Sequence, residues 1–256
     1  MGKNTTISWT ETIMPDGTAR PGHTWNPWQG CRKVSPGCLN CYMYRDKKRY
    51  GQDPATVVRS KPATFNAPLH WKDPARVFVC SWSDFFIEDA DPWREEAWEI
   101  MRATPHLTYM LLTKRPENIK GRLPMAYEAF GGGWPLPNVW LGVTAENQEM
   151  ANKRLAVLLF DVPAVKRFVS VEPMVGPVDL GHALCKAWSD GGLTMGSYLD
   201  WVIVGGESGP NARDMDPMWA LHLKEQCADT NTPFFMKQMS GKAPIPDFLE
   251  GREFPA

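Results

Sequence analysis

The sequence has almost no net charge and no long apolar run. Its 28 lysines and arginines nearly balance 29 aspartates and glutamates, which leaves a formal net charge of −1 at pH 7. A basic field over the whole molecule for gripping nucleic acid is therefore excluded, and any such contact must come from a local patch. No apolar stretch approaches the roughly 18 residues of a membrane-spanning helix. The first residues, "MGKNTTISWTET", lack the apolar centre of a signal peptide. We expect a cytoplasmic protein with no membrane partner.

Cysteine is scarce, yet half of it is crowded into one stretch. Only six cysteines occur in 256 residues, and three of them fall within "TWNPWQGCRKVSPGCLNCYMYR" at residues 24–45. In a reducing compartment, clustered cysteines indicate metal binding or catalysis rather than disulfides. The clustered cysteines are Cys31, Cys38 and Cys41. The others, which show no ligand spacing, are Cys80, Cys185 and Cys227.

The spacing C-x6-C-x2-C suits two kinds of site. A closed structural zinc site needs four ligands, and His23, eight residues before Cys31, is the nearest candidate for the fourth. A four-iron four-sulfur (4Fe-4S) cluster held by three thiolates instead leaves one iron open to a substrate or cofactor. Closely spaced cysteines occur both in zinc sites and in iron–sulfur sites. The residues alone therefore leave two alternatives open, a zinc-stabilised nucleic-acid-binding module and an iron–sulfur protein.

Short apolar runs alternate with helical patterns along most of the chain. Near-continuous apolar strands separated by helices imply a parallel sheet. A further strand leads into the cysteine loop. The other predicted strands are residues 76–82, 107–113, 138–144, 165–173, 200–207 and 233–239. The predicted helices are residues 91–104, with Asp91 as N-cap, 147–160 and 217–230.

This pattern predicts one α/β domain over residues 1–256. The expected architecture is a partial or complete parallel β/α barrel of about six strand–helix units, with an N-terminal segment at 1–22 and a cluster-binding loop at 29–45. In such a fold the chemistry lies at the C-terminal ends of the strands. Polar and charged residues recur there, namely Ser83, Asp84, Thr113, Lys114, Glu146, Glu172 and Glu207, with Gly205 and Gly206 directly before Glu207. Strands that end at the solvent usually end in polar residues, which explains part of this pattern. The repeated pairing of hydroxyls with charged groups nevertheless predicts that these residues line a pocket.

Six ordered blocks carry a resemblance to a known family. They are "TWNPWQGCRKVSPGCLNCYMYR", "FVCSWSDFF", "LLTKRPENI", "WLGVTAENQ", "VSVEPMVGPV" and "WVIVGGESG". Three clustered cysteines in a loop at the start of a β/α barrel resemble the radical S-adenosylmethionine (radical SAM) superfamily. Together, the blocks more closely resemble a phage-associated, three-cysteine family that is related to spore photoproduct lyase.

The resemblance implies a 4Fe-4S cluster and SAM as cofactors. Cys31, Cys38 and Cys41 would ligate three irons, and the fourth would chelate the amino and carboxylate groups of SAM. One electron, from a flavodoxin- or ferredoxin-type donor, would cleave SAM to a 5′-deoxyadenosyl radical that abstracts hydrogen from the substrate. The first cysteine gap departs from the superfamily's usual C-x3-C-x2-C, because it is longer here.

The resemblance also implies roles for single residues. Asn40 stands where the superfamily often has an aromatic residue beside the SAM adenine, and Tyr42 is the substitute. Ser83 and Asp84 are the positional candidates for SAM contact. The "GGE" at 205–207 is similar to the superfamily's SAM-amine motif, although it follows a late strand. Further cofactor contacts are expected from Thr113 and Glu146, and catalytic roles from Cys80, Tyr42, Lys114 and Glu172.

Two basic runs, at residues 45–49 together with 32–33 and at residues 114–122, predict an anionic substrate. A single run usually forms a solvated face, but two runs on the cysteine side of a barrel favour a phosphate-bearing ligand. The expected nucleic-acid contacts are Arg32, Lys33, Arg45, Lys48, Arg49 and Arg115. A base inside a duplex would have to flip out to meet a buried radical.

The family link to a DNA-lesion lyase and to phages points to nucleobases. We expect a phage- or prophage-encoded isomerase or lyase that modifies or isomerises a nucleobase in DNA, for example a hypermodified thymine. Repair of a thymine photoproduct is the alternative. The residues do not define the oligomeric state.

Overall fold

The computed structural model describes residues 2–14, 16–124, 133–184 and 198–255 of the chain. These residues form two compact units. The first unit comprises Met1–Lys33, Tyr42–Leu141 and Val162–Val165, and the second comprises Val34–Cys41, Gly142–Asp161 and Lys166–Ala256. The predicted cysteine loop is thus shared, with Cys31 in the first unit and Cys38 and Cys41 in the second. The single domain that the sequence favours stays a prediction.

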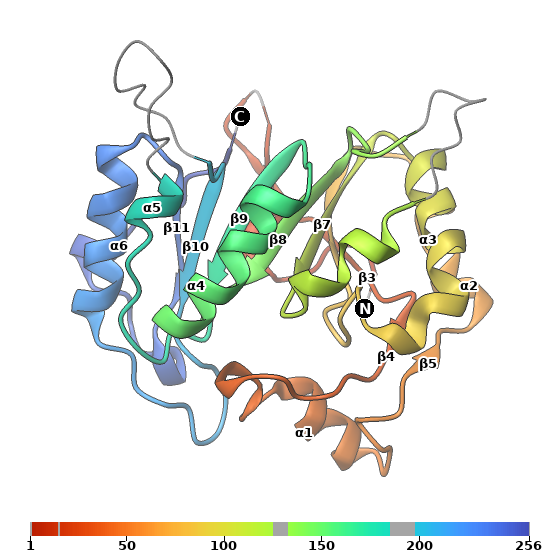
Figure 1. Cartoon of the computed structure of the whole chain (residues 1–256), viewed down its shortest axis with the longest axis horizontal. Coiled ribbons are helices and arrows are strands. Elements are labelled where there is room, and N and C mark those ends of the chain that lie inside the picture. The colour runs from red at the N-terminus through yellow and green to blue at the C-terminus, as the bar shows by residue number, and fades with distance from the viewer. Residues whose placement is uncertain (1, 15, 125–132, 185–197, 256) are drawn as a thin grey trace. The chain divides into compact units, whose positions relative to one another are not determined.

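The main sheet has seven strands: β3 (His23–Trp25), β6 (Ala75–Val79), β7 (Leu107–Thr113), β8 (Val139–Thr144), β9 (Lys166–Val171), β10 (Trp201–Gly205) and β11 (Phe234–Gln238). Within the first unit the strand order is β7-β6-β3, and within the second unit it is β11-β10-β9 (Figure 1). Strands β3, β6 and β7 pair in parallel within the first unit, and β9, β10 and β11 do so within the second. Each predicted strand is present, and the α/β class with a parallel sheet is confirmed.

Apolar side chains of β6 and β7 build the core of the first unit. Burial alternates along β6, where Ala75, Val77 and Val79 are buried, and β7 is buried along most of its length. Trp98 of α3 (Asp91–Ala103) meets the edge of the Phe85 ring at 4.8 Å. Aromatic packing of this kind adds to the large apolar area that such rings bury, and it holds the predicted helix against the core.

One expectation about α3 is wrong. Asp91 is the first residue of the helix, and Ala90 is its N-cap. The Asp91 carboxylate forms ion pairs with Arg94 and Arg122 instead. The two guanidinium groups engage both carboxylate oxygens, which explains why Asp91 does not cap the first turn.

The first unit also holds two small antiparallel pairs and several short helices. The pairs are β1 (Thr12–Ile13) with β2 (Ala19–Arg20) and β4 (Trp28–Gln29) with β5 (Val58–Arg59). The helices are α1 (Tyr42–Arg49), α2 (Pro62–Phe65), η1 (Ser8–Thr10), η3 (Ala67–His70), η4 (Glu88–Ala90), η5 (Pro116–Asn118) and η6 (Lys120–Arg122).

In the second unit, β10 is buried at every position. The predicted helices appear as α4 (Gln148–Ala156) and α6 (Pro217–Asp229), capped by the side chains of Asn147 and Asp216. Helix α6 packs against β11 and α5 (Gly181–Leu184). The remaining elements are η2 (Pro36–Cys38), the π-helical η8 (Val157–Asp161), η9 (Ser240–Lys242) and η10 (Asp247–Leu249).

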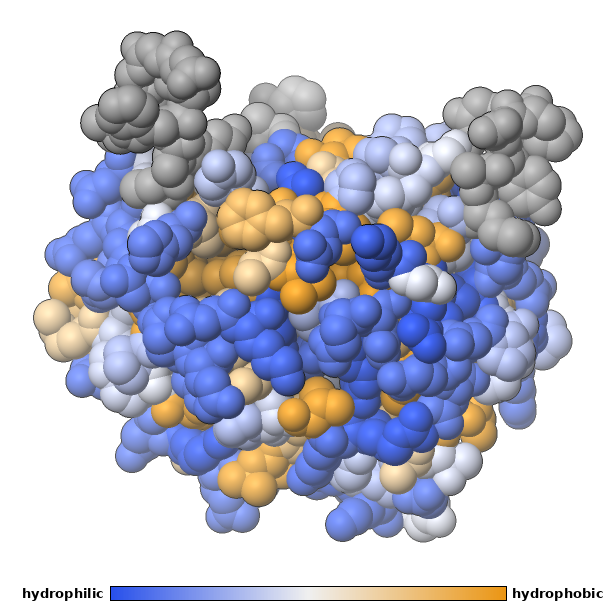
Figure 2. Space-filling model, in the orientation of Figure 1, coloured by the Kyte–Doolittle hydropathy of each residue, from blue (hydrophilic) through white to orange (hydrophobic). Residues whose placement is uncertain are grey.

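Most large apolar side chains lie inside these units. Trp25, Trp28, Trp98 and Trp201 are among the largest fully buried residues. The face drawn in Figure 2 is covered mainly by hydrophilic residues, with apolar residues between them. In the described residues, no helix has the length and apolar character needed to cross a membrane.

Candidate functional site

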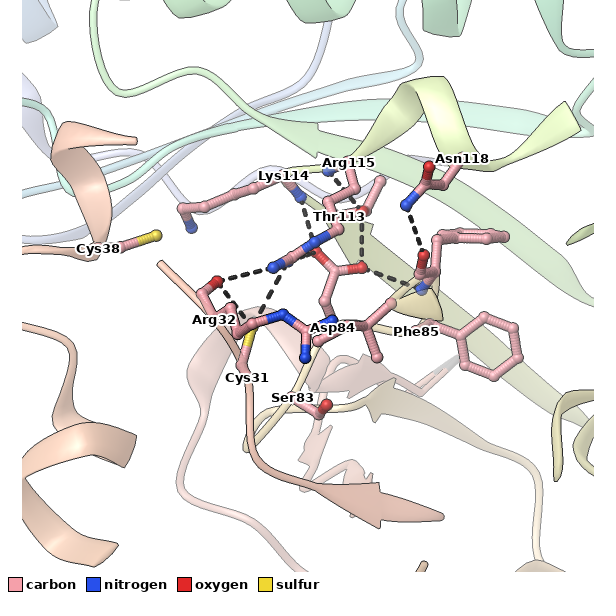
Figure 3. A network of polar contacts seen from close by, with 12 residues as sticks. Cys31, Arg32, Cys38, Ser83, Asp84, Phe85, Thr113, Lys114, Arg115 and Asn118 are labelled. Atoms are coloured by element: carbon pink, nitrogen blue, oxygen red, sulfur yellow. Dashed lines mark hydrogen bonds and ion pairs between the residues drawn. The ribbon is translucent and has the colours of Figure 1, made fainter. Parts of the chain in front are cut away.

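Asp84 is the centre of a polar network in the first unit (Figure 3). It follows β6 and is 5% exposed. Its carboxylate accepts hydrogen bonds from the Thr113 hydroxyl at 2.7 Å, from the Lys114 backbone N–H at 3.0 Å and from the Phe86 backbone N–H at 3.0 Å. Because Thr113 ends β7, the strand next to β6, the network joins the C-terminal ends of two neighbouring strands. The structure thus brings together three predicted cofactor and catalytic residues, and donors of the chain itself satisfy the Asp84 carboxylate.

Arg115 connects this carboxylate to the first cysteine. Its guanidinium is nearly buried and lies 3.3 Å from the Asp84 carboxylate. It donates to Cys31 Sγ at 3.5 Å and to the Arg32 carbonyl at 2.7 Å. Burial lowers the pKa of Arg115, but Asp84 and Cys31 outweigh burial and raise the pKa above its ordinary value. A fixed cation beside a cysteine favours the thiolate, which is the form that binds metals.

The backbone around Cys31 is held on several sides within the first unit. The Cys31 N–H donates to the Pro54 carbonyl at 2.9 Å, and the Tyr44 hydroxyl donates to the Cys31 carbonyl. Ser83 donates its hydroxyl to the Gly30 carbonyl at 2.6 Å. Gly30 has φ +100° and lies so close to Thr56 that a Cβ would meet the Thr56 carbonyl oxygen. Ser83, expected to contact SAM, therefore helps to fix the cysteine backbone.

Two carboxylates hold the loop of the second unit. The Gly37 N–H donates to Glu146 Oε1 at 3.0 Å, and Asn40 Nδ2 donates to Glu207 Oε2 at 2.8 Å. Glu146 is fully buried and follows β8, whereas Glu207 is nearly buried and follows β10. Both residues are sequence-predicted cofactor contacts, and each touches the loop that carries Cys38 and Cys41.

An arginine fixes each of these two carboxylates. Arg154 of α4 lies 2.6 Å from Glu146 Oε2 and also donates to the Thr144 carbonyl. Arg213 binds both oxygens of Glu207, at 2.7 and 3.0 Å, and its backbone N–H donates to the same carboxylate. Burial alone would raise the pKa of Glu207, but the hydrogen bonds from Arg213 and Asn40 outweigh it and lower the pKa. Sequence reasoning missed both arginines, although Arg213 lies only six residues after Glu207.

Glu172 and Lys237 form an ion pair at the ends of β9 and β11. Both side chains are partly exposed. Strand β10 lies between them in the sheet, and a Cβ added to its last residue, Gly205, would lie 3.3 Å from Glu172 Cδ. Gly206 lies against Ser240, where a Cβ would meet the backbone nitrogen. The small residues of the "GGE" sequence thus allow close packing at these strand ends.

The described cysteines differ in their surroundings. Cys31, Cys38 and Cys41 form no disulfide and are partly exposed, while Cys80 and Cys227 form no disulfide and are buried. Burial raises the pKa of Cys80 well above its ordinary value and that of Cys227 to about 12. Both buried thiols therefore stay protonated at neutral pH. Cys80 directly follows β6 with φ +59°, and Cys185 lies outside the described residues.

His23 lies in the core of the first unit. Its Nδ1 accepts from the Asn4 backbone N–H at 3.2 Å, and its ring meets the Trp71 ring at 4.7 Å. Burial lowers its pKa. This packing favours a structural role over that of a fourth zinc ligand. Within the described ranges, no group of three or more His, Cys, Asp and Glu side chains is arranged to hold a metal ion. The donors at the cysteine stretch are thiols, which suit iron–sulfur clusters and zinc.

Most of the predicted nucleic-acid contacts lie on the surface. Lys33, Lys48 and Arg49 are exposed, and Lys33 also lies over the Tyr44 ring at 4.9 Å. The other exposed cations, Arg32 and Arg45, form ion pairs with Asp89 and Asp46. Arg115 differs because it is buried against Asp84, which favours a structural role. Tyr42, at the start of α1, donates its hydroxyl to the Ser81 carbonyl.

The fold and the site define an α/β protein with a parallel sheet and a stretch that carries three partly exposed cysteines without disulfides. The chain belongs to DUF5131, a family described as a protein of unknown function, whose model matches residues 4–248. No curated protein and no solved structure matches the chain.

The Asp84–Arg115 pair generates a stability prediction. Removing one partner of a buried ion pair leaves an uncompensated charge and costs about 3–5 kcal/mol. We expect Asp84→Ala to lower the free energy of unfolding by this amount in urea titrations. Asp89→Ala removes the exposed partner of Arg32 and is the control, with an expected loss of about 0–1 kcal/mol. Equal losses in the two variants would contradict the role given to Asp84.

The lowered pKa of Glu207 generates a pH prediction. Its ordinary value is 4.5, so the carboxylate contributes stability that is present above a pH of about 4.5 and is lost as the pH falls through the lower, folded pKa. Glu207→Gln removes this contribution. We expect the gap in unfolding free energy between wild type and variant to be constant near neutral pH and to shrink in acid. A gap of constant size down to a pH of about 3 would show that ionisation of Glu207 does not matter.

Proposed function

We propose that the protein is a radical SAM enzyme in which Cys31, Cys38 and Cys41 ligate a 4Fe-4S cluster. The contrast among the cysteines carries this proposal. The three at C-x6-C-x2-C spacing are partly exposed, whereas Cys80 and Cys227 are buried with raised pKa values. A set of three clustered thiolates favours a cluster with an open iron over a closed zinc site, which needs four ligands. When bound, the cluster and SAM would supply the electron transfer and the radical chemistry.

The residues of the chain prepare this site in the proposed enzyme. Arg115 places a positive charge at Cys31 Sγ, and Asp84 balances that charge. Ser83 and Tyr44 hold the backbone on either side of this thiol. Fixed hydrogen-bond donors near ligating sulfurs are one of the means by which proteins tune iron–sulfur potentials.

For the substrate, we propose a nucleobase in DNA that the enzyme modifies or isomerises. Lys33, Lys48 and Arg49 are exposed cations close in sequence to the cysteines, and exposed cations are suited to phosphates. Because the net charge is only −1, a local group of cations such as this one has to make the contact with DNA. The resemblance to a phage-associated family supports a phage or prophage origin, and a host flavodoxin- or ferredoxin-type protein suits the role of electron donor.

Anaerobic reconstitution tests the enzyme class. We expect a brown protein with about four irons per chain, which releases 5′-deoxyadenosine when dithionite and SAM are added. Cys31→Ala, Cys38→Ala and Cys41→Ala should each lose both properties. Cys227→Ala is the matched control and should keep them. A colourless wild-type protein with one tightly held zinc would instead show a structural metal site.

Salt-dependent DNA binding tests the substrate class. Each phosphate contact contributes about 0.9 to the slope of log affinity against log salt concentration for duplex DNA. A double variant, Lys48→Gln with Arg49→Gln, should therefore weaken binding and reduce this slope by about 2. Lys153→Gln removes an exposed cation of α4 and is the control. An unchanged slope would exclude α1 from the DNA contact.

A further inference from the structure

In the second unit, the residue directly before each cysteine is held by a carboxylate. Gly37 precedes Cys38 and donates its N–H to Glu146. Asn40 precedes Cys41 and donates its side-chain amide to Glu207 at 2.8 Å and to the Asn211 carbonyl at 2.9 Å. The two thiols of the C-x2-C pair are therefore each one residue away from a fixed hydrogen bond.

The two carboxylates are anchored by rigid elements. Glu146 follows β8 and pairs with Arg154, a residue of α4, and both side chains are almost completely buried. Glu207 follows β10, and Arg213 engages both of its oxygens. Every oxygen of the two carboxylates accepts at least one hydrogen bond from the chain. Their geometry is set before any ligand binds.

The loop is shaped to approach these carboxylates closely. Gly37 is buried, and a Cβ there would lie 2.9 Å from Glu146 Cδ and Oε1. Any larger residue would have to push the backbone away from Glu146 and would break the hydrogen bond. The glycine at this position therefore serves the contact between the loop and Glu146.

We propose that Glu146 and Glu207 are positioning residues for the metal-binding loop, in place of the direct cofactor contacts that the sequence predicts for them. They hold Gly37 and Asn40 so that the Cys38 and Cys41 thiols are presented together. This inference rests on the proposed function, because it assigns the two thiols to a metal. Residues that orient metal ligands from behind in this way typically change metal affinity 10–100-fold when they are mutated.

Asn40→Ala tests this role with little risk to the fold. The side chain is partly exposed, and the change leaves the Glu207–Arg213 pair in place. Glu207→Gln is the second variant. Asn152→Ala is the matched control, since Asn152 is an exposed asparagine of the same unit with one side-chain hydrogen bond, to Gln148.

The first measurement is hydrogen exchange of residues 35–41 in the metal-free full-length protein. We expect Asn40→Ala and Glu207→Gln to speed exchange in this segment about tenfold, as for the loss of one hydrogen bond. Asn152→Ala should leave it unchanged. Urea midpoints should be the same for Asn40→Ala and Asn152→Ala, which separates local positioning from loss of overall stability.

The second measurement is iron release from the anaerobically reconstituted protein to a ferrous chelator. Asn40→Ala should release iron about 10–100-fold faster than wild type and Asn152→Ala. Unchanged exchange, or unchanged iron release from an iron-loaded protein, would overturn the positioning role. If the wild type takes up no iron while exchange in the loop still rises, the proposed function fails and the carboxylates remain positioning residues for the loop alone.

Discussion

The position of the cysteine stretch depends on one kind of interaction that occurs three times. In each case, a buried carboxylate that follows a strand is paired with an arginine. In the first unit, Arg115 is paired with Asp84 and donates a hydrogen bond to Cys31 Sγ. In the second unit, Glu146 with Arg154 holds Gly37, and Glu207 with Arg213 holds Asn40. A buried carboxylate must be paired and hydrogen-bonded, because burying an isolated charge is costly. Glu146 and Glu207 meet this need partly with donors from the cysteine stretch, whereas the donors to Asp84 come from the end of β7 and from residues after β6 and β7.

This arrangement ties the position of the loop to the sheet. The carboxylates follow β6, β8 and β10, and of these strands β8 and β10 are buried at every position. Buried ion pairs contribute little net stability over apolar residues of similar volume. Their directed hydrogen bonds nevertheless define where the backbone lies, and the proposed metal ligands require such a fixed backbone. Polar side chains at the strand ends thus hold the backbone around the cysteines.

Much of the fold could be predicted from the sequence, and the reasons are local. Strand β7 coincides with the predicted run at residues 107–113, because its apolar residues are continuous and β-branched or aromatic residues are frequent. The predicted N-cap of α3, Asp91, is the first residue of the helix instead. Its carboxylate forms an ion pair with Arg122, which lies far along the chain, so the residues around Asp91 do not predict this contact. The partners Arg154 and Arg213 were missed for a different reason, because an arginine in a helix or loop is usually interpreted as a solvated charge.

By itself, the sequence determined the alternation of strands and helices, the parallel α/β class and the crowding of three cysteines into one loop. These features follow from residue types and their spacing, which act over a few neighbours. Only the tertiary structure decided what the strand-end carboxylates touch. Asp84, Glu146 and Glu207 are expected at a cofactor, which stays a prediction, and the structure shows that they accept hydrogen bonds from backbone, arginine and asparagine groups. Those partners lie up to 167 residues apart along the chain, and only folding brings such distant groups within hydrogen-bonding distance.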